Sequence, residues 1–341
     1  MIVRDDRKLA SIRIIQSIEP IEGADRIEVA RIGGWNVVVQ KGLYEPGDAV
    51  VYFEIDSCLP VDNELFAFLK ERGTRKTDEG DVHVVKTVRL RGVYSQGLCI
   101  PVEEIFPGSY WDADRTPDGT DVTSLLGIGK WEPGTNDFSR GNTAGSFPLD
   151  LAMKTDSERV QNLTSKYEYL LDYDWEATVK VDGTSCTVGM RPDDEIVVAS
   201  RNLSVTEGDN TYWRAARQII PHLTPGMAVQ MEIAGPGIQG NPQKLANQRV
   251  YIFDVVRNGF IIPRSAWPVW AQELSAPVLP DLKLPETVEE AIAQADGLKY
   301  DFGGGRVLAE GIVWHEVNGQ APAALGRSTF KVVSNKYLLK H

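Results

Sequence analysis

Short runs in which apolar and polar residues alternate dominate the first third of the chain. Alternation with a period of two is typical of β-strands that bury one face. Five such runs occur, at residues 11–18, 26–32, 35–40, 49–55 and 84–92. Turn residues such as Gly33-Gly34 and Pro46-Gly47 separate them, and one helical run, residues 64–71, interrupts the series. The pattern predicts a small β-barrel in residues 1–110.

An oligonucleotide-binding (OB) barrel is the leading candidate for this unit, because that fold closes about five short strands into a small barrel. A sandwich or an SH3-like barrel would give a similar pattern. The second half of the chain has longer apolar strands, at 177–181, 195–200, 228–235, 250–256, 311–317 and 329–333. Helices are expected at 157–171, 210–220 and 286–295. The irregular gaps between these elements favour an α+β fold over a regular βαβ array.

A change in composition separates the two halves. Residues 111–150 are rich in Gly, Pro, Ser, Thr and Asn, which is typical of a connector. The sequence therefore predicts an OB-like, nucleic-acid-binding barrel in residues 1–110, a connector in 111–150 and a larger domain in 151–341.

Composition indicates a globular protein, with 42% hydrophobic and 25% charged residues among 341. No apolar run approaches the roughly 18 residues of a membrane helix, and the N-terminus is too charged for a secretory signal, so we expect a cytoplasmic protein without membrane contacts. Cys58, Cys99 and Cys186 are widely spaced, which predicts core residues and argues against disulfides or a structural zinc site.

The formal net charge of −12 argues against non-specific coating of nucleic acid but leaves room for a local basic track. Two short basic runs lie in the first third. They are Lys70/Arg72/Arg75/Lys76 and Lys86/Arg89/Arg91. A solvated surface is the more common interpretation of such runs.

The candidate chemistry centres on Lys180, which ends an apolar strand and is followed by Asp182 and Gly183. On a strand the lysine and the carboxylate point to the same face, and the glycine allows a tight turn. This four-residue pattern is common by chance. It gains weight because three later apolar strands also carry charged residues, namely Glu232, Glu310 and Lys331.

The order and spacing of these motifs resemble those of the covalent nucleotidyltransferase superfamily, which contains polynucleotide ligases and mRNA capping enzymes. The matching segments are Lys180 to Gly183, Ser200 to Asn202, Glu232, Phe253, Glu310 to Val313 and Phe330 to Val333. The resemblance covers residues 150–341 and implies ATP-grasp-like antiparallel sheets with helices. Val333 departs from it, because many ligases carry a second lysine at this position. Lys336 is a candidate substitute.

A narrower resemblance, to the Deinococcus/Naegleria-type RNA ligase clade, rests on residues 154–162, on the C-terminal segment 331–338 and on the N-terminal barrel. Only ten residues follow Lys331, too few for the C-terminal barrel of DNA ligases and capping enzymes. The resemblance implies an ATP-dependent RNA ligase that joins 3′-OH and 5′-phosphate ends. We expect a monomer. It further implies nicked duplexes whose 3′-OH strand is RNA as substrates.

The same resemblance implies roles for individual residues. Lys180 would carry AMP, Lys331 would neutralise the α-phosphate, Arg159 would bind the β- and γ-phosphates, Arg201 would contact the ribose or the RNA end, and Phe253 would stack on adenine. Val181, Gly183, Ser185 and Glu232 complete the expected nucleotide site.

A divalent cation is expected in this site for an electrostatic reason. Carboxylates at Asp182, Glu232 and Glu310 would raise the pKa of Lys180, which must be neutral to react. A cation held by all three, partly through water, would reverse that effect, and we predict Mg²⁺ or Mn²⁺.

Three alternatives remain open at this stage. The chain could be a DNA ligase or a capping-type nucleotidyltransferase. It could be an RNA-binding protein with a catalytically degenerate second domain, although the complete charged set argues against degeneracy. It could also be an adaptor that uses both domains as surfaces, which would leave the charged strand residues unexplained.

Overall fold

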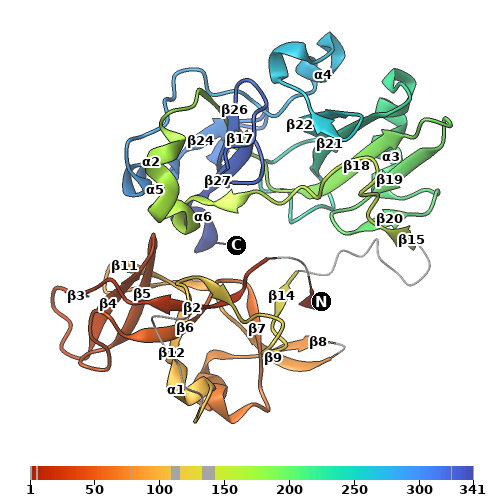
Figure 1. Ribbon diagram of the computed structural model, residues 1–341. Coiled ribbons are helices and arrows are strands. Elements are labelled where there is room, and N and C mark those ends of the chain that lie inside the picture. Colours follow the sequence, from red (N-terminus) through yellow and green to blue (C-terminus); the bar gives the residue numbers. More distant parts are fainter. Residues whose placement is uncertain are drawn as a thin grey trace. The chain divides into compact units, whose positions relative to one another are not determined.

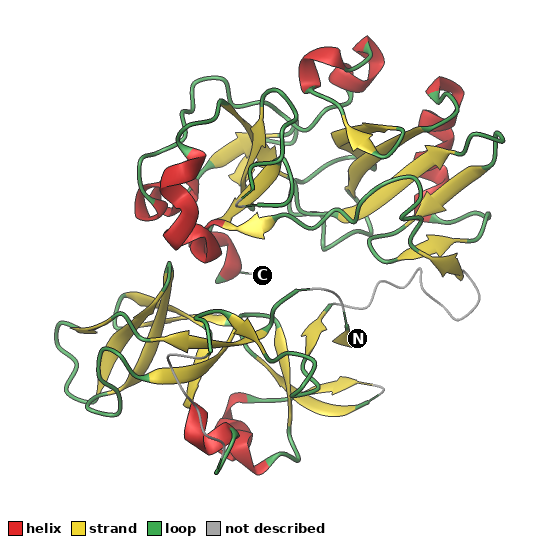
Figure 2. Ribbon diagram, in the orientation of Figure 1, coloured by secondary structure: helices red, strands yellow, loops and turns green. Residues whose placement is uncertain are grey.

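The computed structural model describes residues 2–4, 7–77, 79–108, 116–132, 143–323 and 325–340. The chain forms two compact units, Met1–Gly134 and Thr135–His341. Figure 1 shows that strands make up most of both units, and Figure 2 shows short helices at the periphery of the sheets. Among the helices described, none combines the length and the apolar composition needed to cross a bilayer.

The first unit consists of short antiparallel strands in four small sheets. One sheet has the order β12 (Leu98–Pro101), β6 (Ala49–Phe53), β2 (Ala10–Ile14) and β13 (Thr120–Asp121). A second contains β3 (Ser17–Pro20), β4 (Ile27–Ile32) and β5 (Trp35–Gln40). A third has the order β1 (Ile2–Val3), β14 (Gly129–Trp131), β7 (Ser57–Pro60), β9 (Gly80–Val84) and β8 (Arg75–Thr77). The fourth is the hairpin of β10 (Thr87–Leu90) and β11 (Val93–Gln96).

Alternating side chains build the core of this unit, as the sequence predicts. In β5, Trp35, Val37 and Val39 are buried and pack against Val50 and Tyr52 of β6. Cys58, Cys99 and, in the second unit, Cys186 are free and buried, which confirms them as core residues. Two helices complete the unit, the 3₁₀ helix η1 (Glu64–Arg72) and α1 (Val102–Ile105).

Two expected strands of this unit are divided in the structure. The run 11–18 breaks at Ile15, whose backbone N–H and C=O bond to Asp48 and Gly47 instead of continuing the ladder. The run 84–92 is the end of β9 followed by β10. The expected helix at 64–71 is present but has 3₁₀ geometry.

The expected connector, residues 111–150, contains strands as well as turns. β13 pairs with β2, and β14 pairs with β1 and β7, so both belong to the first unit. β15 (Thr143–Ser146) pairs with β20 of the second unit. Glycine and proline in this range therefore partly mark turns between very short strands. Residues 111–115 and 133–142 of the expected connector lie outside the described residues.

The second unit contains a seven-stranded antiparallel sheet. Its order is β15, β20 (Leu203–Val205), β19 (Ile196–Ala199), β18 (Thr184–Met190), β21 (Met227–Ala234), β22 (Arg249–Arg257) and β23 (Phe260–Ile261). The core on one face combines apolar strand side chains with α3 (Thr211–Ile219) and α4 (Val269–Glu273). Two 3₁₀ turns, η3 (Ile220–His222) and η4 (Arg264–Ala266), lie nearby in the chain.

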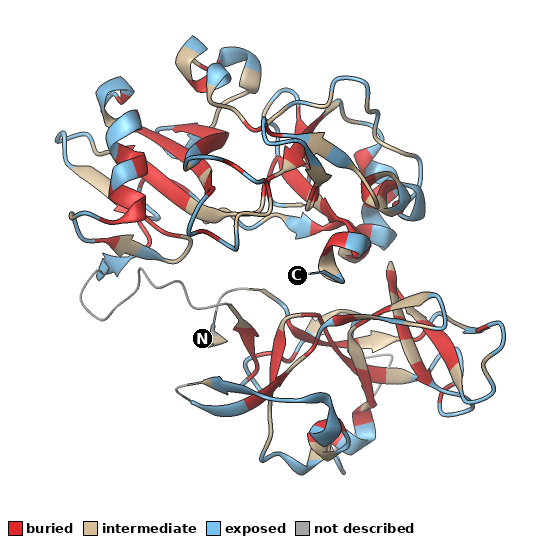
Figure 3. Cartoon of the chain, turned by 180° about the vertical axis from the view of Figure 1, so that it is seen from behind, coloured by how far each residue is buried: buried red, intermediate tan, exposed pale blue. Residues whose placement is uncertain are grey.

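A four-stranded sheet forms the other half of this unit. Its order is β16 (Glu158–Arg159), β27 (Thr329–Val333), β26 (Gly311–Glu316) and β17 (Trp175–Lys180). Its core on one face includes side chains of η2 (Val160–Lys166), α2 (Tyr167–Leu170) and α5 (Val288–Ala295). The hairpin β24 (Lys299–Asp301) and β25 (Arg306–Leu308) and the helix α6 (Asn335–Leu338) complete the unit. Figure 3 shows the central strands of both sheets as buried.

The helix expected at 157–171 begins later than predicted. Glu158 and Arg159 form a parallel strand pair with β27, so only the residues after them coil, first as η2 and then as α2. The helices expected at 210–220 and 286–295 are confirmed as α3 and α5.

An extended segment, residues 274–279, joins the two sheets. Its backbone bonds to Ile252 of β22 at one end and to Ala177 and Val179 of β17 at the other, with N···O distances of 2.8 Å. A buried ion pair adds a second connection, because Arg327, just before β27, contacts Asp254 of β22 and donates to Gln230 of β21 at 3.1 Å. The two sheets are therefore held together by backbone bonds and by buried charge.

Candidate active site

Lys180 is the last residue of β17, in register with Gly311 of β26. Its side chain lies on the sheet face opposite the apolar core, because Ala177 and the strand residues that pack with it point the other way. The next strand begins at Thr184, and the chain passes so close to β21 that a Cβ on Gly183 would collide with the carbonyl oxygen of Ile233. Close backbone approach, not a special φ, explains this glycine.

The ammonium of Lys180 forms an ion pair with Glu310, with Nζ and Oε2 2.6 Å apart. Both side chains are largely buried, with 23% and 16% of their surface exposed. Burial lowers the pKa of Lys180, but the charges of Glu310, Glu232 and Asp182 outweigh it, and the net effect raises the pKa above its ordinary value. Lys180 is thus held protonated, as expected for a lysine among carboxylates.

The pKa values of the other two carboxylates, Asp182 and Glu232, are raised well above their ordinary values. Burial, with the repulsion of Glu310 and Asp182, raises the pKa of Glu232 to about 8 despite the opposing charge of Lys180. Burial and Glu310 raise the pKa of Asp182 to about 7, although a hydrogen bond from Tyr337 and the charge of Lys180 lower it. One ammonium does not compensate three carboxylates, so the cluster favours binding of further positive charge.

Tyr337 is a site residue that the sequence did not reveal. Its hydroxyl donates to Oδ2 of Asp182 at 2.5 Å. The tyrosine lies on α6, which Ser334 caps through its side chain, and Asp296 accepts hydrogen bonds from the Ser334 hydroxyl and the Lys336 backbone N–H. A tyrosine six residues after the motif lysine carries no chemical signal by itself, and only the fold places it on Asp182.

The backbone of Asp182 is held as well, because Gln243 donates from Nε2 to its carbonyl oxygen at 2.6 Å. The turn after Lys180 is therefore fixed from three sides, by Gln243, by Tyr337 and by the close contact of Gly183 with β21. Such positioning matters for any side chain that reacts, since small displacements reduce rates strongly.

Lys331 and Arg159 provide positive charge on the same face as Lys180. Arg159 is directly opposite Lys331 in the parallel pair of β16 and β27, and Lys331 is opposite Val313 of β26. Residues in direct register point to the same side of a sheet, so the two cations form one row next to the row of Lys180. This row suits an anionic ligand such as a chain of phosphates.

Side chains predicted for the nucleotide site occur on both sheets. Ser185 of β18 is in register with Glu232 of β21 and forms a 3.0 Å hydrogen bond with Thr155. Val181 is buried in a cluster with Tyr251 and Phe302. Arg201 forms an ion pair with Asp156, and its charge lowers the pKa of Glu232.

Phe253 occupies a β-bulge. Met231 pairs with Ile252 and Gln230 pairs with Asp254, so Phe253 has no partner in the β21–β22 ladder. A bulge re-aims the side chain of its extra residue and is frequent next to active sites. Phe253 is half-buried, which is compatible with stacking on a base.

Two predictions about the site receive no support from the geometry. In the described part of the chain, no three His, Cys, Asp or Glu side chains are arranged to hold a metal ion. A cation held by Asp182, Glu232 and Glu310 partly through water therefore stays a prediction. Lys336, the candidate substitute at Val333, has its Nζ 3.9 Å from Asp296 and is 55% exposed.

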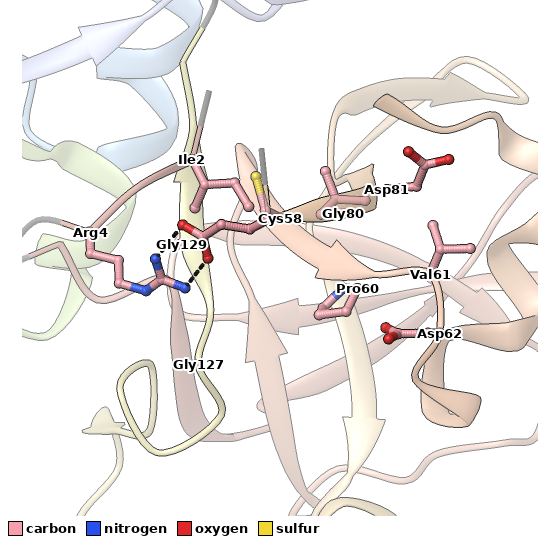
Figure 4. Close-up of a pocket in the computed structure, with 12 residues that line it drawn as sticks. Ile2, Arg4, Cys58, Pro60, Val61, Asp62, Gly80, Asp81, Gly127 and Gly129 are labelled. Carbon is pink, nitrogen blue, oxygen red and sulfur yellow. Dashed lines mark hydrogen bonds and ion pairs between the residues drawn. The ribbon is translucent and has the colours of Figure 1, made fainter. Parts of the chain in front are cut away.

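A separate cavity of about 300 Å³ lies in the first unit (Figure 4). Arg4 pairs with Glu79 there through two hydrogen bonds of 2.6 and 2.7 Å, and Asp62 and Asp81 also line the walls. Three carboxylates and one ion-paired arginine give this cavity a negative charge, which does not favour phosphate binding.

Comparison with known proteins agrees with this arrangement. A family model described as an OB-fold domain matches residues 9–102, and one described as RNA ligase matches residues 173–333. No curated protein matches the chain. The OB-fold match resolves the choice among barrels that the strand pattern had left open, and the α+β prediction is confirmed.

Solved structures of the RNA ligase of Naegleria gruberi are similar over the whole chain. The form with PPi is 38% identical, with a TM-score of 0.84 and coverage of 98% of this chain and 99% of that one. A variant with ATP and Mn is 36% identical, with a TM-score of 0.82 and the same coverage. An apo variant is 36% identical, with a TM-score of 0.84 and coverage of 99% of both chains. The chain therefore belongs to the RNA ligase family.

Proposed function

We propose that this ATP-dependent RNA ligase seals nicks whose 3′-OH strand ends in ribonucleotides and that Lys180 carries the AMP. The observation that carries the proposal is the convergence of Glu310, Asp182 and Glu232 on Lys180 beside a row of cations. Structures of the Naegleria ligase with ATP and Mn and with PPi support ATP as the substrate.

Three in-line transfers at phosphorus account for the reaction. The neutral amine of Lys180 attacks the α-phosphate of ATP, a P–N bond forms, and the P–O bond to pyrophosphate breaks. The 5′-phosphate of the RNA then displaces Lys180 and forms a pyrophosphate linkage to AMP. Finally the 3′-OH attacks that 5′-phosphate, loses its proton, and releases AMP. Protein groups contribute mainly by positioning and by stabilising charge.

We assign the cationic residues of the site to the phosphate groups of ATP and the RNA. Lys331 would neutralise the α-phosphate, and Arg159, directly opposite it, would bind the β- and γ-phosphates. Phe253 would stack on adenine, and Ser185 and Val181 would line the nucleotide site. Arg201, already ion-paired to Asp156, would contact the ribose or the RNA end.

The carboxylate cluster fits a hard divalent cation. Carboxylate oxygens are the ligands that Mg²⁺ and Mn²⁺ prefer. The raised pKa values of Asp182 and Glu232 indicate that the buried carboxylates repel one another and lack a compensating positive charge. When bound, such a cation would lower the pKa of Lys180 and stabilise charge on the α-phosphate. Asp182, Glu232 and Glu310 would hold it partly through water, because they are not arranged as three direct ligands.

The substrate proposal predicts discrimination at one sugar. Two nicked duplexes that differ only in ribose or deoxyribose at the 3′-OH terminus should be sealed at rates that differ by about tenfold or more, because the 2′-OH distinguishes RNA from DNA. Gel analysis of single-turnover sealing measures this. Equal rates would refute the requirement for a ribonucleotide at the 3′-OH end. Faster joining of free single strands than of nicked duplexes would refute the assignment of nicks as the substrate.

Glu310→Gln should separate the two roles of the carboxylate. Loss of its charge should lower the pKa of Lys180 in the metal-free protein, because the ion pair stabilises the ammonium. Amine-reagent labelling as a function of pH measures that shift. Adenylylation with Mg²⁺ should nevertheless fall by about tenfold or more if Glu310 also helps to hold a cation. The exposed Glu289→Gln serves as the matched control. Faster adenylylation of Glu310→Gln at neutral pH would contradict a role in holding the cation and leave Glu310 with the ion pair to Lys180 as its role.

Tyr337→Phe should slow adenylylation without unfolding the protein. The variant keeps the ring but loses the bond to Asp182, and a hydrogen bond to a charged group is worth about 1.5–3 kcal/mol. If the bond acts through positioning, kcat should fall about tenfold while the KM for ATP changes less than about twofold. Tyr167→Phe, which loses a 3.0 Å bond to the Pro285 carbonyl away from the site, is the control. An unchanged kcat in Tyr337→Phe would refute the positioning role.

A further inference from the structure

We propose that the β10–β11 hairpin of the OB-fold unit contacts the phosphate backbone of the RNA substrate. This inference rests on the proposed function, because it assigns part of the substrate-binding surface of the ligase. Arg89 lies in β10, Arg91 lies in the turn after it, and Lys86 directly precedes β10. These three residues are the second of the two basic runs in the sequence, and none of them belongs to the catalytic unit.

The backbone of the hairpin turn places a cation at a strained position. Arg91 and Gly92 connect the strands with φ values of +48° and +87°. Such two-residue turns favour Asn, Asp or Gly at the first position, and a left-handed conformation costs other residues roughly 1 kcal/mol or more. A strained residue persists where it serves a purpose, and here the turn presents an exposed arginine at its tip.

The base of the hairpin is fixed to the barrel. The N–H of Val38 in β5 donates to the Ser95 hydroxyl at 2.9 Å, and Gln96 donates to Thr87 across the hairpin at 3.2 Å. The hydroxyl of Tyr52 donates to the Gln96 carbonyl at 2.7 Å. A cationic tip on a rigid base loses little conformational entropy when it binds.

The charge of the hairpin stands out in an acidic chain. No Asp or Glu occurs between Asp81 and Glu103, although the chain has 48 acidic residues. Lys86, Arg89 and Arg91 are exposed, and no carboxylate of the described residues forms an ion pair with them. Other cations of the unit are neutralised in this way. The pairs are Arg4–Glu79, Arg7–Glu54, Arg13–Asp118, Arg31–Glu19 and Lys130–Glu132.

The first basic run makes a poorer candidate for the same role. Lys70, Arg72, Arg75 and Lys76 are interspersed with acids in the sequence. These acids are Asp62, Glu64, Glu71, Asp78, Glu79 and Asp81. The local charge of that stretch is therefore close to neutral or negative, whereas that of the hairpin is positive, and a polyanion is attracted to the hairpin.

An aromatic ring next to these cations adds a stacking surface. Arg89 and Tyr94 are in direct register, and the guanidinium carbon lies 5.4 Å from the ring centroid. The Nε of Arg89 also donates to the Gly92 carbonyl at 3.1 Å, which fixes the guanidinium above the ring. Arginine with a planar partner suits phosphate and sugar contacts of a nucleic acid.

The test compares two double variants of the full-length protein. Arg89→Gln/Arg91→Gln removes two charges from the hairpin, and Arg26→Gln/Lys41→Gln removes two exposed charges elsewhere in the same unit. Fluorescence anisotropy measures the Kd for a nicked RNA duplex with a 5′-OH, which cannot be sealed, over a series of salt concentrations. Labelling by ATP of both variants reports on the catalytic unit separately.

The hairpin variant should bind about tenfold more weakly. The negative slope of the logarithm of the association constant against log salt should become shallower by about 1.8, since each phosphate contact contributes about 0.9. The control should stay within about twofold of the unmodified protein. Arg89→Lys/Arg91→Lys, which keeps the charge, should retain the slope.

An unchanged Kd, or a weaker Kd with an unchanged slope, would overturn the inference. If the unmodified protein is not labelled by ATP, the proposed function is refuted instead. Failure of the hairpin inference is therefore distinguishable from failure of the proposed function.

Discussion

The ion pair between Lys180 and Glu310 is the interaction around which the catalytic unit is arranged. It holds the lysine in a fixed position, but together with Asp182 and Glu232 it also keeps the amine protonated and therefore unreactive. As the proposed nucleophile, Lys180 would therefore be held in its unreactive, protonated form until the charge around it changes. A divalent cation would bring the positive charge that lowers the pKa of Lys180, whereas the phosphates of ATP alone would raise it. Activation of Lys180 would therefore depend on binding of the metal.

The surrounding fold serves to bring charged residues from distant parts of the chain onto this pair. Residues 274–279 connect the two sheets through backbone bonds, and the buried Arg327–Asp254 pair connects β27 to β22. Removing one partner of this buried pair would leave an uncompensated buried charge, which costs about 3–5 kcal/mol. The C-terminal helix adds Tyr337, so the segment that carries Lys331 also positions Asp182.

Much of this site was predictable, for a physical reason. Lysine and carboxylate side chains in apolar strands are costly unless they have partners, so Lys180, Glu232, Glu310 and Lys331 stood out against their neighbours. The strands that carry them followed from apolar runs. Tyr337 could not be found in this way, because a tyrosine close to a chain end has no unusual local context. The bulge at Phe253 and the joining segment 274–279 depend on pairing between distant strands, which local patterns do not encode. The short strands β13 and β14 were hidden in a stretch whose composition resembles a connector.

A labelling experiment shows whether Lys180 is the group that receives AMP. The protein is incubated with α-labelled ATP and Mg²⁺, and the modified residue is located by peptide mass spectrometry. We expect one AMP on the peptide that contains Lys180, released by pyrophosphate and absent in Lys180→Ala. Unchanged labelling of Lys180→Ala, or AMP on a different residue, would contradict it.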